Sequence, residues 1–403
     1  MDKERLRSLL RRAMIVLLTV SAVFLSWRTG YFNAPARETG SGTEASAAEE
    51  QRAPMPLRPI GILATRADGS RAAALYDASA VDAAFAPLAA LLGEALGTAS
   101  EPKAMSEAEF RALLEGESAL LDLGAEYPLE LLASWLGAGG GNGVAAELLC
   151  LAGSASGVAL AYRTADGGFF RCDTATNREL LSARLAELTG EAAGLAFEEA
   201  GLGSLDPFLI LPETGPTAFA VAVSPAYPDA GALMDAFGMN RYVASAYREN
   251  DGTQVYVDGD RTLRIAADGT VSYRARAAEG DGQSAIESAL RLSEAALGRL
   301  DGDAVLGFVR CEAEGERETV VLDYRVNNVP VTLAAGNAAV LEYRNGALSG
   351  ATLLSRAFQL TESDEPVLPT RFAAAIAAAG EGGGLHLRYV ERSDGLRCLW
   401  VYD

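Results

Sequence analysis

Ile60-Gly-Ile-Leu-Ala64 and Ala72-Ala-Ala-Leu-Tyr76 are two short apolar runs that stand on either side of Asp68-Gly69. Asp-Gly is a dipeptide that favours the tight turn of a β-hairpin, so the two runs predict a pair of antiparallel strands. A helical pattern follows at once, because apolar residues recur at steps of three and four from Val81 to Leu96. A hairpin that leads into an amphipathic helix predicts an α+β fold built on antiparallel sheets.

The alternation of hairpins and helices continues through the first half of the chain. Ser106-Glu-Ala-Glu109 has the form of a capping box and predicts a short helix, and residues 176–188 predict another. The sequence shows no regular strand–helix–strand period of the kind that would indicate a parallel sheet. We therefore expect an N-terminal α+β domain over residues 59–203.

The second half of the sequence contains a faint internal repeat. Segments 241–311 and 317–390 each show a strand meander, a helix and a further strand, which predicts two copies of one unit over 204–312 and 313–403. Chance matching of common hairpin signals is the alternative. Four residue pairs keep one spacing between the copies: Val243/Val320, Tyr247/Tyr324, Arg248/Arg325 and Gly269/Gly346.

The N-terminus joins basic residues to the apolar run Ala13–Trp27. By the positive-inside rule, we expect residues 1–32 to form a cytoplasmic stub and a transmembrane anchor, with the bulk of the chain extracytoplasmic after a disordered linker over 33–58. The alternative is a cleaved signal peptide, but the nearby Ala34-Pro35-Ala36 site lies well beyond the run. The basic residues before the run are Lys3, Arg5, Arg7, Arg11 and Arg12.

Small residues in the anchor form a candidate contact with another helix. Thr19, Ala22 and Ser26 are spaced by three and four, so they share one face and would let a second helix approach closely. The alternative is that small residues are incidental in an alanine-rich protein.

Composition argues against several classes of function. The chain has 54 acidic against 34 basic residues and a formal net charge of −20, so we expect no nucleic-acid partner. Its one histidine, His386, is expected to be an ordinary strand residue. One histidine and four scattered cysteines support neither a histidine-based triad nor a zinc site. We expect no catalytic residues, metal or cofactor, and therefore no enzyme.

The four cysteines leave two interpretations open. An even number of cysteines outside the cytoplasm permits disulfides, whereas a free cysteine packs like a small apolar residue. If disulfides form, we expect Cys150 to pair with Cys172 and Cys311 with Cys398, because each pair lies on strands that are plausible neighbours.

Several stretches resemble the YycH/YycI family. The residues that carry the likeness are the basic N-terminus with Ile15–Trp27, then Pro128–Gly137, Tyr247–Tyr256 with Leu263-Arg-Ile265, Asp268–Tyr273 and the terminal Leu396–Trp400. The family's last strand usually has a proline before the tryptophan, and Cys398 stands in that neighbourhood here.

The resemblance implies a single-pass extracytoplasmic regulator of a WalK-type sensor histidine kinase that controls cell-wall metabolism in Gram-positive bacteria. It implies the kinase as a partner, contacted in part through the anchor, and a paralogous accessory protein as a second partner. The alternative function is an anchored binding module for a cell-envelope ligand, and a hydrolase with two carboxylates is a more distant one.

Overall fold

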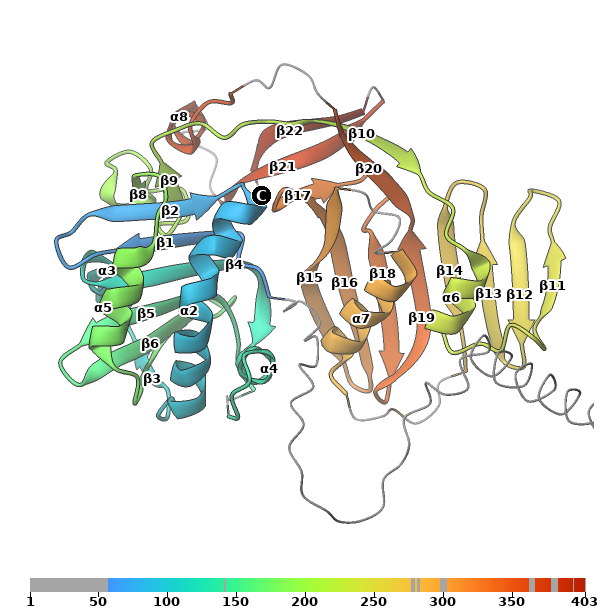
Figure 1. Cartoon of the computed structure of the whole chain (residues 1–403), viewed down its shortest axis with the longest axis horizontal. Helices are drawn as coiled ribbons and strands as arrows, with labels where there is room; N and C mark the ends of the chain where they lie inside the picture. The colour runs from blue at the N-terminus through green and yellow to red at the C-terminus, as the bar shows by residue number, and fades with distance from the viewer. Residues whose placement is uncertain are drawn as a thin grey trace, which may run out of the picture. The chain divides into compact units, whose positions relative to one another are not determined.

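Two large β-sheets, with helices packed on them, form the framework of the molecule (Figure 1). The computed structural model describes residues 57–140, 143–276, 280, 283–297, 303–361, 367–377, 383–393 and 395–402. In these residues the fold is α+β with mainly antiparallel pairing, which confirms the predicted class. The expected anchor, with Thr19, Ala22 and Ser26, and the linker up to residue 56 lie outside the described residues.

The first sheet has seven strands in the order β2-β1-β4-β5-β6-β7-β3, and all neighbours are antiparallel. Its first hairpin is the predicted one: Gly69 at the turn has a φ of +81°, and Asp68 Oδ1 accepts a hydrogen bond from the Ser70 N–H at 2.9 Å. The strands are β1 (Gly61–Thr65), β2 (Arg71–Leu75), β3 (Lys103–Met105), β4 (Ser118–Pro128), β5 (Ala145–Ser154), β6 (Gly157–Arg163) and β7 (Phe169–Asp173).

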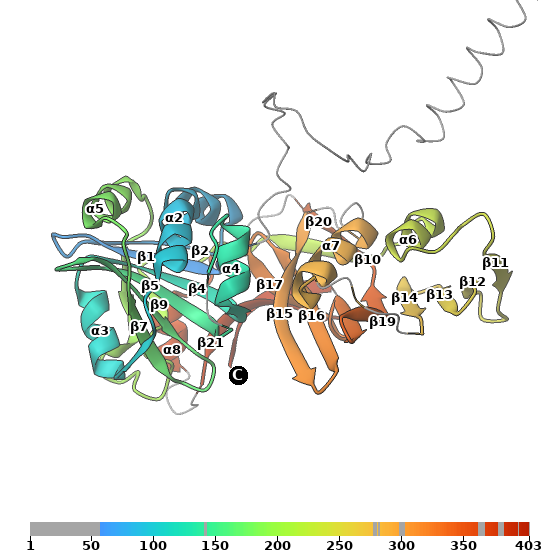
Figure 2. The same ribbon diagram turned by 90° about the horizontal axis from the view of Figure 1, so that it is seen from below.

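Helices cover both faces of this sheet. Side chains alternate along a strand, so Ile62 and Leu63 of β1 face opposite sides. Ile62 packs in the cluster that contains α2, α4 and α5, whereas Leu63 packs with Phe110 of α3 (Figure 2). The predicted capping box is present at α3, where Ser106 and Glu109 bond each other's backbone N–H. The helices are α2 (Ala78–Thr98), α3 (Glu107–Glu115), α4 (Leu129–Trp135) and α5 (Arg178–Glu187).

Helix α2 is long and apolar enough to cross a membrane by length and composition, the one such helix among the described residues. Half of its apolar window is buried inside the protein, and Val81, Leu88 and Leu92 are fully buried against the first sheet and its helices. Burial of this kind is the property of a core helix. Its apolar face therefore accounts for its composition without a membrane.

The second sheet has thirteen strands and is antiparallel except for the pair β17–β21. One part is a long antiparallel array from β11 to β16, covered by α6 and α7. The other part is β17, β21, β22, β10 and β20, of which β17, β21 and β22 lie nearest the first sheet (Figure 1). The elements are β10 (Ala220–Pro225), α6 (Ala230–Ala236), β11 (Ser245–Arg248), β12 (Gln254–Asp258), β13 (Arg261–Ile265), β14 (Thr270–Arg274), α7 (Ala285–Leu297), β15 (Ala304–Glu314), β16 (Arg317–Val326), β17 (Val329–Thr332), β18 (Ala339–Arg344), β19 (Ala347–Leu354), β20 (Arg356–Thr361), β21 (Leu385–Arg392) and β22 (Gly395–Tyr402).

The predicted duplication is not seen in the strand pairing. Strands β11 to β14 of the first segment form a simple antiparallel meander. In the second segment, β17 does not continue such a meander but pairs in parallel with β21. Nor does the sheet divide at residue 312, because β15 and β16 pair along most of their length. The expected units 204–312 and 313–403 thus share one sheet, and hairpin signals alone did not reveal which strands would be neighbours.

Short elements that are far apart in the sequence connect the two sheets. Strands β8 (Ala193–Leu195) and β9 (Ile210–Pro212) form a two-stranded sheet, and a 3-10 turn, Ala196–Glu198, follows β8. Helix α8 (Arg371–Ala377) packs against β9. Tyr127 of β4 and Phe308 of β15 place their ring centroids 4.9 Å apart. Residues from the chain's two halves therefore share a continuous apolar core.

The turn between β16 and β17 forms the most specific link between the sheets. Asn327 and Asn328 both have positive φ, 47° and 67°, a conformation that asparagine tolerates better than most residues. Asn327 Oδ1 accepts the Ala78 N–H at the start of α2 at 2.9 Å, and Asn328 Nδ2 donates to the Pro59 carbonyl at 2.9 Å. Asn328 is 2% exposed, so its bond to the Pro59 carbonyl is made away from water.

We expect Asn328→Ala to lower the free energy of unfolding by roughly 2–4 kcal/mol, because alanine is strained at positive φ and the buried Pro59 carbonyl loses its donor. Asn345→Ala is the matched control: Asn345 has a φ of 51° in another hairpin turn but is exposed. It should lose only the backbone part, about 1–2 kcal/mol. Urea unfolding measures both, and equal losses would contradict the proposed link.

Candidate functional site

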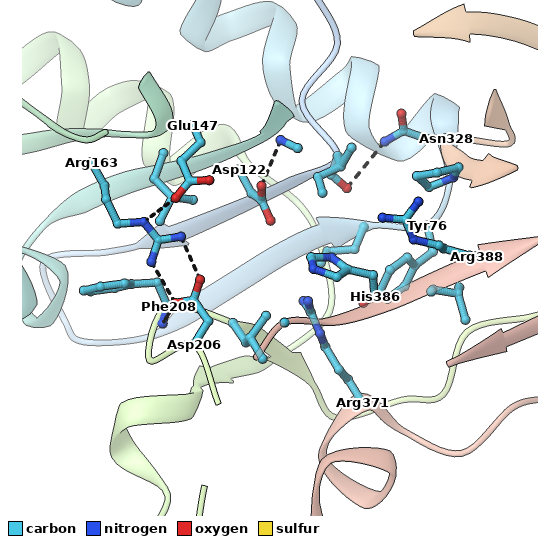
Figure 3. A pocket seen from close by; sticks show the side chains of 18 residues that line it. Tyr76, Asp122, Glu147, Arg163, Asp206, Phe208, Asn328, Arg371, His386 and Arg388 are labelled. Atoms are coloured by element: carbon cyan, nitrogen blue, oxygen red, sulfur yellow. Dashed lines mark hydrogen bonds and ion pairs between the residues drawn. The ribbon is translucent and has the colours of Figure 1, made fainter. Parts of the chain in front are cut away.

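A cavity of about 380 Å³ lies where the two sheets meet (Figure 3). Its walls come from the first sheet and the segment before β9 on one side, and from β17, β21 and the start of α8 on the other. Most of the side chains labelled in Figure 3 are charged, which is unusual for a space between packed sheets. These side chains are Asp122, Glu147, Arg163, Asp206, Arg371, His386 and Arg388.

At one end of the cavity, Arg163 on β6 is shared by two carboxylates. Its Nη1 and Nη2 donate to both oxygens of Asp206 at 2.9 and 2.7 Å, and its Nε lies 2.7 Å from Glu147 Oε1. The guanidinium also stands over the Phe208 ring, 5.4 Å from its centroid. Only 15% of the Arg163 side chain is exposed, so the bidentate pair is well protected from water.

Burial and pairing act in opposite directions on these two acids. Burial raises the pKa of Glu147, and Arg163 offsets this only in part. Burial would also raise the pKa of Asp206, but the two bonds from Arg163 outweigh it, so the pKa of Asp206 lies below its ordinary value. With two carboxylates on one guanidinium, this end of the cavity is negative.

Asp122 on β4 is a third carboxylate of the cavity, and it has no ion-pair partner within 4.0 Å among the described residues. One oxygen accepts the Gly124 N–H at 3.0 Å. Gly124 has a φ of +67°, and a Cβ there would meet Ile60 at 2.8 Å, so this turn requires glycine. Burial is the main cause that raises the pKa of Asp122, although Arg371 and His386 act against it.

Arg371, at the first position of α8, supplies positive charge from the other side. It is 3% exposed, and its guanidinium donates to the Leu385 carbonyl at 3.1 and 2.6 Å and to the Ile210 carbonyl at 3.1 Å. No carboxylate lies within ion-pair distance of it among the described residues. His386 and Arg388 stand two residues apart on β21 and line the same wall.

Three buried polar atoms of the lining lack a hydrogen-bond partner in the described structure: Tyr76 Oη, Asn328 Oδ1 and Arg163 Nε, the last of which lies 2.7 Å from Glu147 as an ion pair. Tyr76 also has a φ of 59°, a left-handed conformation that is uncommon for an aromatic residue. Such backbone strain persists only where the surroundings enforce it, and it concentrates at binding and active sites. The cavity thus combines strain, unsatisfied polar atoms and charge.

The two aspartates of the lining differ in how they are held. Asp122 and Asp206 have pKa values shifted in opposite directions, as the acid and the nucleophile of a hydrolase do. Both oxygens of Asp206, however, are held by Arg163, and one also accepts the Phe208 N–H at 2.9 Å. The lining contains no serine, threonine or cysteine, and the described residues contain no group of three or more metal-ligating side chains.

The cysteines are all free thiols. Cys150 on β5 and Cys172 on β7 are separated by β6, so about 10 Å lies between their strands, beyond the ~7 Å that a disulfide spans. They also face opposite sides of the sheet. Cys311 lies beside Val320 of β16, and Cys398 beside Tyr389 of β21. The predicted pairings are therefore wrong.

His386 is a strand residue, as expected, but it also lines the cavity. Sequence reasoning did not single out Asp122, Arg163, Asp206 or Arg371. One signal in the sequence was that Asp122 and Arg163 stand within otherwise apolar strand patterns. Charged residues are rarely buried in such strands unless they have a partner.

Asp122→Asn should stabilise the protein at pH 7 by on the order of 1 kcal/mol, because asparagine keeps the Gly124 bond without a charge at this half-buried position. A raised pKa in the folded state means that Asp122 costs nothing below its unfolded value of 3.8 and destabilises as pH rises through the folded pKa. The gain should therefore vanish in acid. Unfolding free energies from pH 3.5 to 7 test this, with exposed Glu126→Gln on β4 as control; a less stable variant at pH 7 would refute it.

Alkylation should report four free thiols. Burial raises the pKa of Cys150 and Cys398 to about 12 and that of Cys311 to about 11, so little thiolate forms at pH 8. We expect iodoacetamide to label the folded protein slowly, with Cys150 last, and to label all four cysteines after unfolding without reductant. Fewer than four labels by mass spectrometry would show a disulfide.

Comparison with known proteins gives no match: no family model, curated protein or solved structure is similar to this chain.

Proposed function

We propose that the protein is a membrane-anchored extracytoplasmic regulator that binds a small ligand and modulates a two-component sensor histidine kinase of cell-wall metabolism. The single observation that carries the binding role is the charged cavity between the sheets. The kinase role is supported by the sequence resemblance and by the basic N-terminus with its apolar run.

The position of the cavity suits a regulator. Its lining comes from both sheets, with Asp122 and Arg163 from one and His386 and Arg388 from the other. A ligand that contacts both walls stabilises the arrangement in which they face each other, and the stabilisation grows with ligand concentration. A ligand can therefore shift the population of conformations that a partner recognises.

Binding without turnover agrees with the state of the carboxylates. Asp206 is fully engaged by Arg163, and among the described residues no cation lies within ion-pair distance of Asp122. With both oxygens engaged, the Asp206 carboxylate is poorly placed to act as a nucleophile or general base.

The anchor face provides the test of the kinase role. We expect Thr19→Leu, Ala22→Leu and Ser26→Leu together to preserve membrane insertion but to abolish recovery of the kinase, because bulky side chains would hold the partner helix away. The measurement is crosslinking in native membranes followed by purification of the full chain and mass spectrometry for sensor kinases.

Matched substitutions on the opposite side of the expected helix are Ala13→Leu, Val20→Leu and Phe24→Leu, which should leave kinase recovery unchanged. Undiminished recovery with the Thr19, Ala22 and Ser26 variant would mean that the helix is only an anchor. Absence of any sensor kinase from the crosslinked wild-type protein would overturn the proposed role.

A further inference from the structure

The cavity has two poles of opposite charge. Glu147, Asp206 and Arg163 cluster at one side, and Arg371, His386 and Arg388 at the other, with Asp122 between them (Figure 3). The first cluster contains two carboxylates for one guanidinium, and Asp122 adds to its negative charge. The second contains two guanidinium groups. A ligand with a single charge would be attracted to one pole and repelled by the other.

The guanidinium of Arg371 is positioned as an anion receptor. Of its five N–H donors, the three described hydrogen bonds use one on each nitrogen, and they hold the planar group against the Leu385 and Ile210 carbonyls. One N–H on each terminal nitrogen remains for a ligand, and such a fork matches the two oxygens of a carboxylate. A buried cation without a counter-ion is costly, so an anion here is favoured.

Asp122 is the complementary group at the negative pole. Its one described bond is to the Gly124 N–H, which leaves acceptor sites for a cation. A primary ammonium group carries three donors and could bond Asp122 while the nearby Glu147 and Asp206 add attraction. The buried and unpartnered Tyr76 Oη supplies a further polar contact in the lining.

We propose that the cavity binds a zwitterion with one ammonium and one carboxylate group a short chain apart, as in a free amino acid or a short peptide. The ammonium faces Asp122 and the carboxylate faces Arg371. The volume of about 380 Å³ is at the lower end for small-ligand sites, which favours a molecule of this size. Leu75, Leu209 and Phe208 provide apolar wall for its carbon atoms.

This inference deepens the proposed binding role, and calorimetry on the purified full chain tests it independently of any kinase. The probes are glycine, alanyl-alanine and trialanine with free ends, N-acetyl-alanyl-alanine without the ammonium, and alanyl-alanine amide without the carboxylate. At least one free zwitterion should bind, and its blocked forms should bind on the order of 10- to 100-fold more weakly.

Two substitutions test which side chain of the protein binds each end of the ligand. Asp122→Asn should weaken the free dipeptide about tenfold and leave the N-acetyl form unchanged, since that form has no ammonium to lose. Arg371→Lys should weaken the free dipeptide and leave the amide unchanged. Exposed residues on the same strands provide the controls, Glu126→Gln on β4 and Arg392→Gln on β21, and neither should alter binding.

Three results would overturn the inference: no binding of any free zwitterion, an N-acetyl form that binds as well as the free dipeptide, or an amide that does so. If Arg371→Lys fails to fold by circular dichroism, the Asp122→Asn variant and the blocked probes still decide. Zwitterion binding without kinase recovery would refute the regulatory role alone, and kinase recovery without zwitterion selectivity would refute only this inference.

Discussion

The left-handed turn at Asn327 and Asn328 is the constraint on which the junction of the two sheets depends. It places one side chain on the start of α2 and the other on the chain just before β1. Because both residues are at positive φ, the β16–β17 hairpin reverses tightly enough to reach the first sheet. Strand β17 can then pair in parallel with β21, and β21 brings His386 and Arg388 to the cavity.

Charge buried at this junction makes it specific at the expense of stability. Asp122 and Arg371 are each desolvated without an ion pair in the described structure, and an apolar junction would have been easier to stabilise. The Arg163 pair shows that the fold can satisfy buried ions where it has partners for them. Groups left unpaired beside a satisfied cluster agree with the proposed ligand, which would contact both sheets.

Local signals predicted local structure well. The Asp68-Gly69 hairpin, the Ser106 capping box and the helix that begins near residue 177 all form as their patterns indicate. Pairing between distant strands was not predictable, because β17 and β21 are neighbours through a turn whose contacts lie elsewhere in the chain. The cavity was missed for the same reason: Asp122, Arg163 and Arg371 are far apart in sequence, and each looks like one charged residue among many.

The chain enters the folded body at the seam between the sheets. Leu57 is 3% exposed, the Arg58 carbonyl accepts a bond from Arg325 at 3.1 Å, and Ile60 lines the cavity. Tension on the polypeptide ahead of residue 57 therefore reaches these contacts before it reaches the interior of either sheet. Force applied through this segment would therefore act first on the residues that line the cavity.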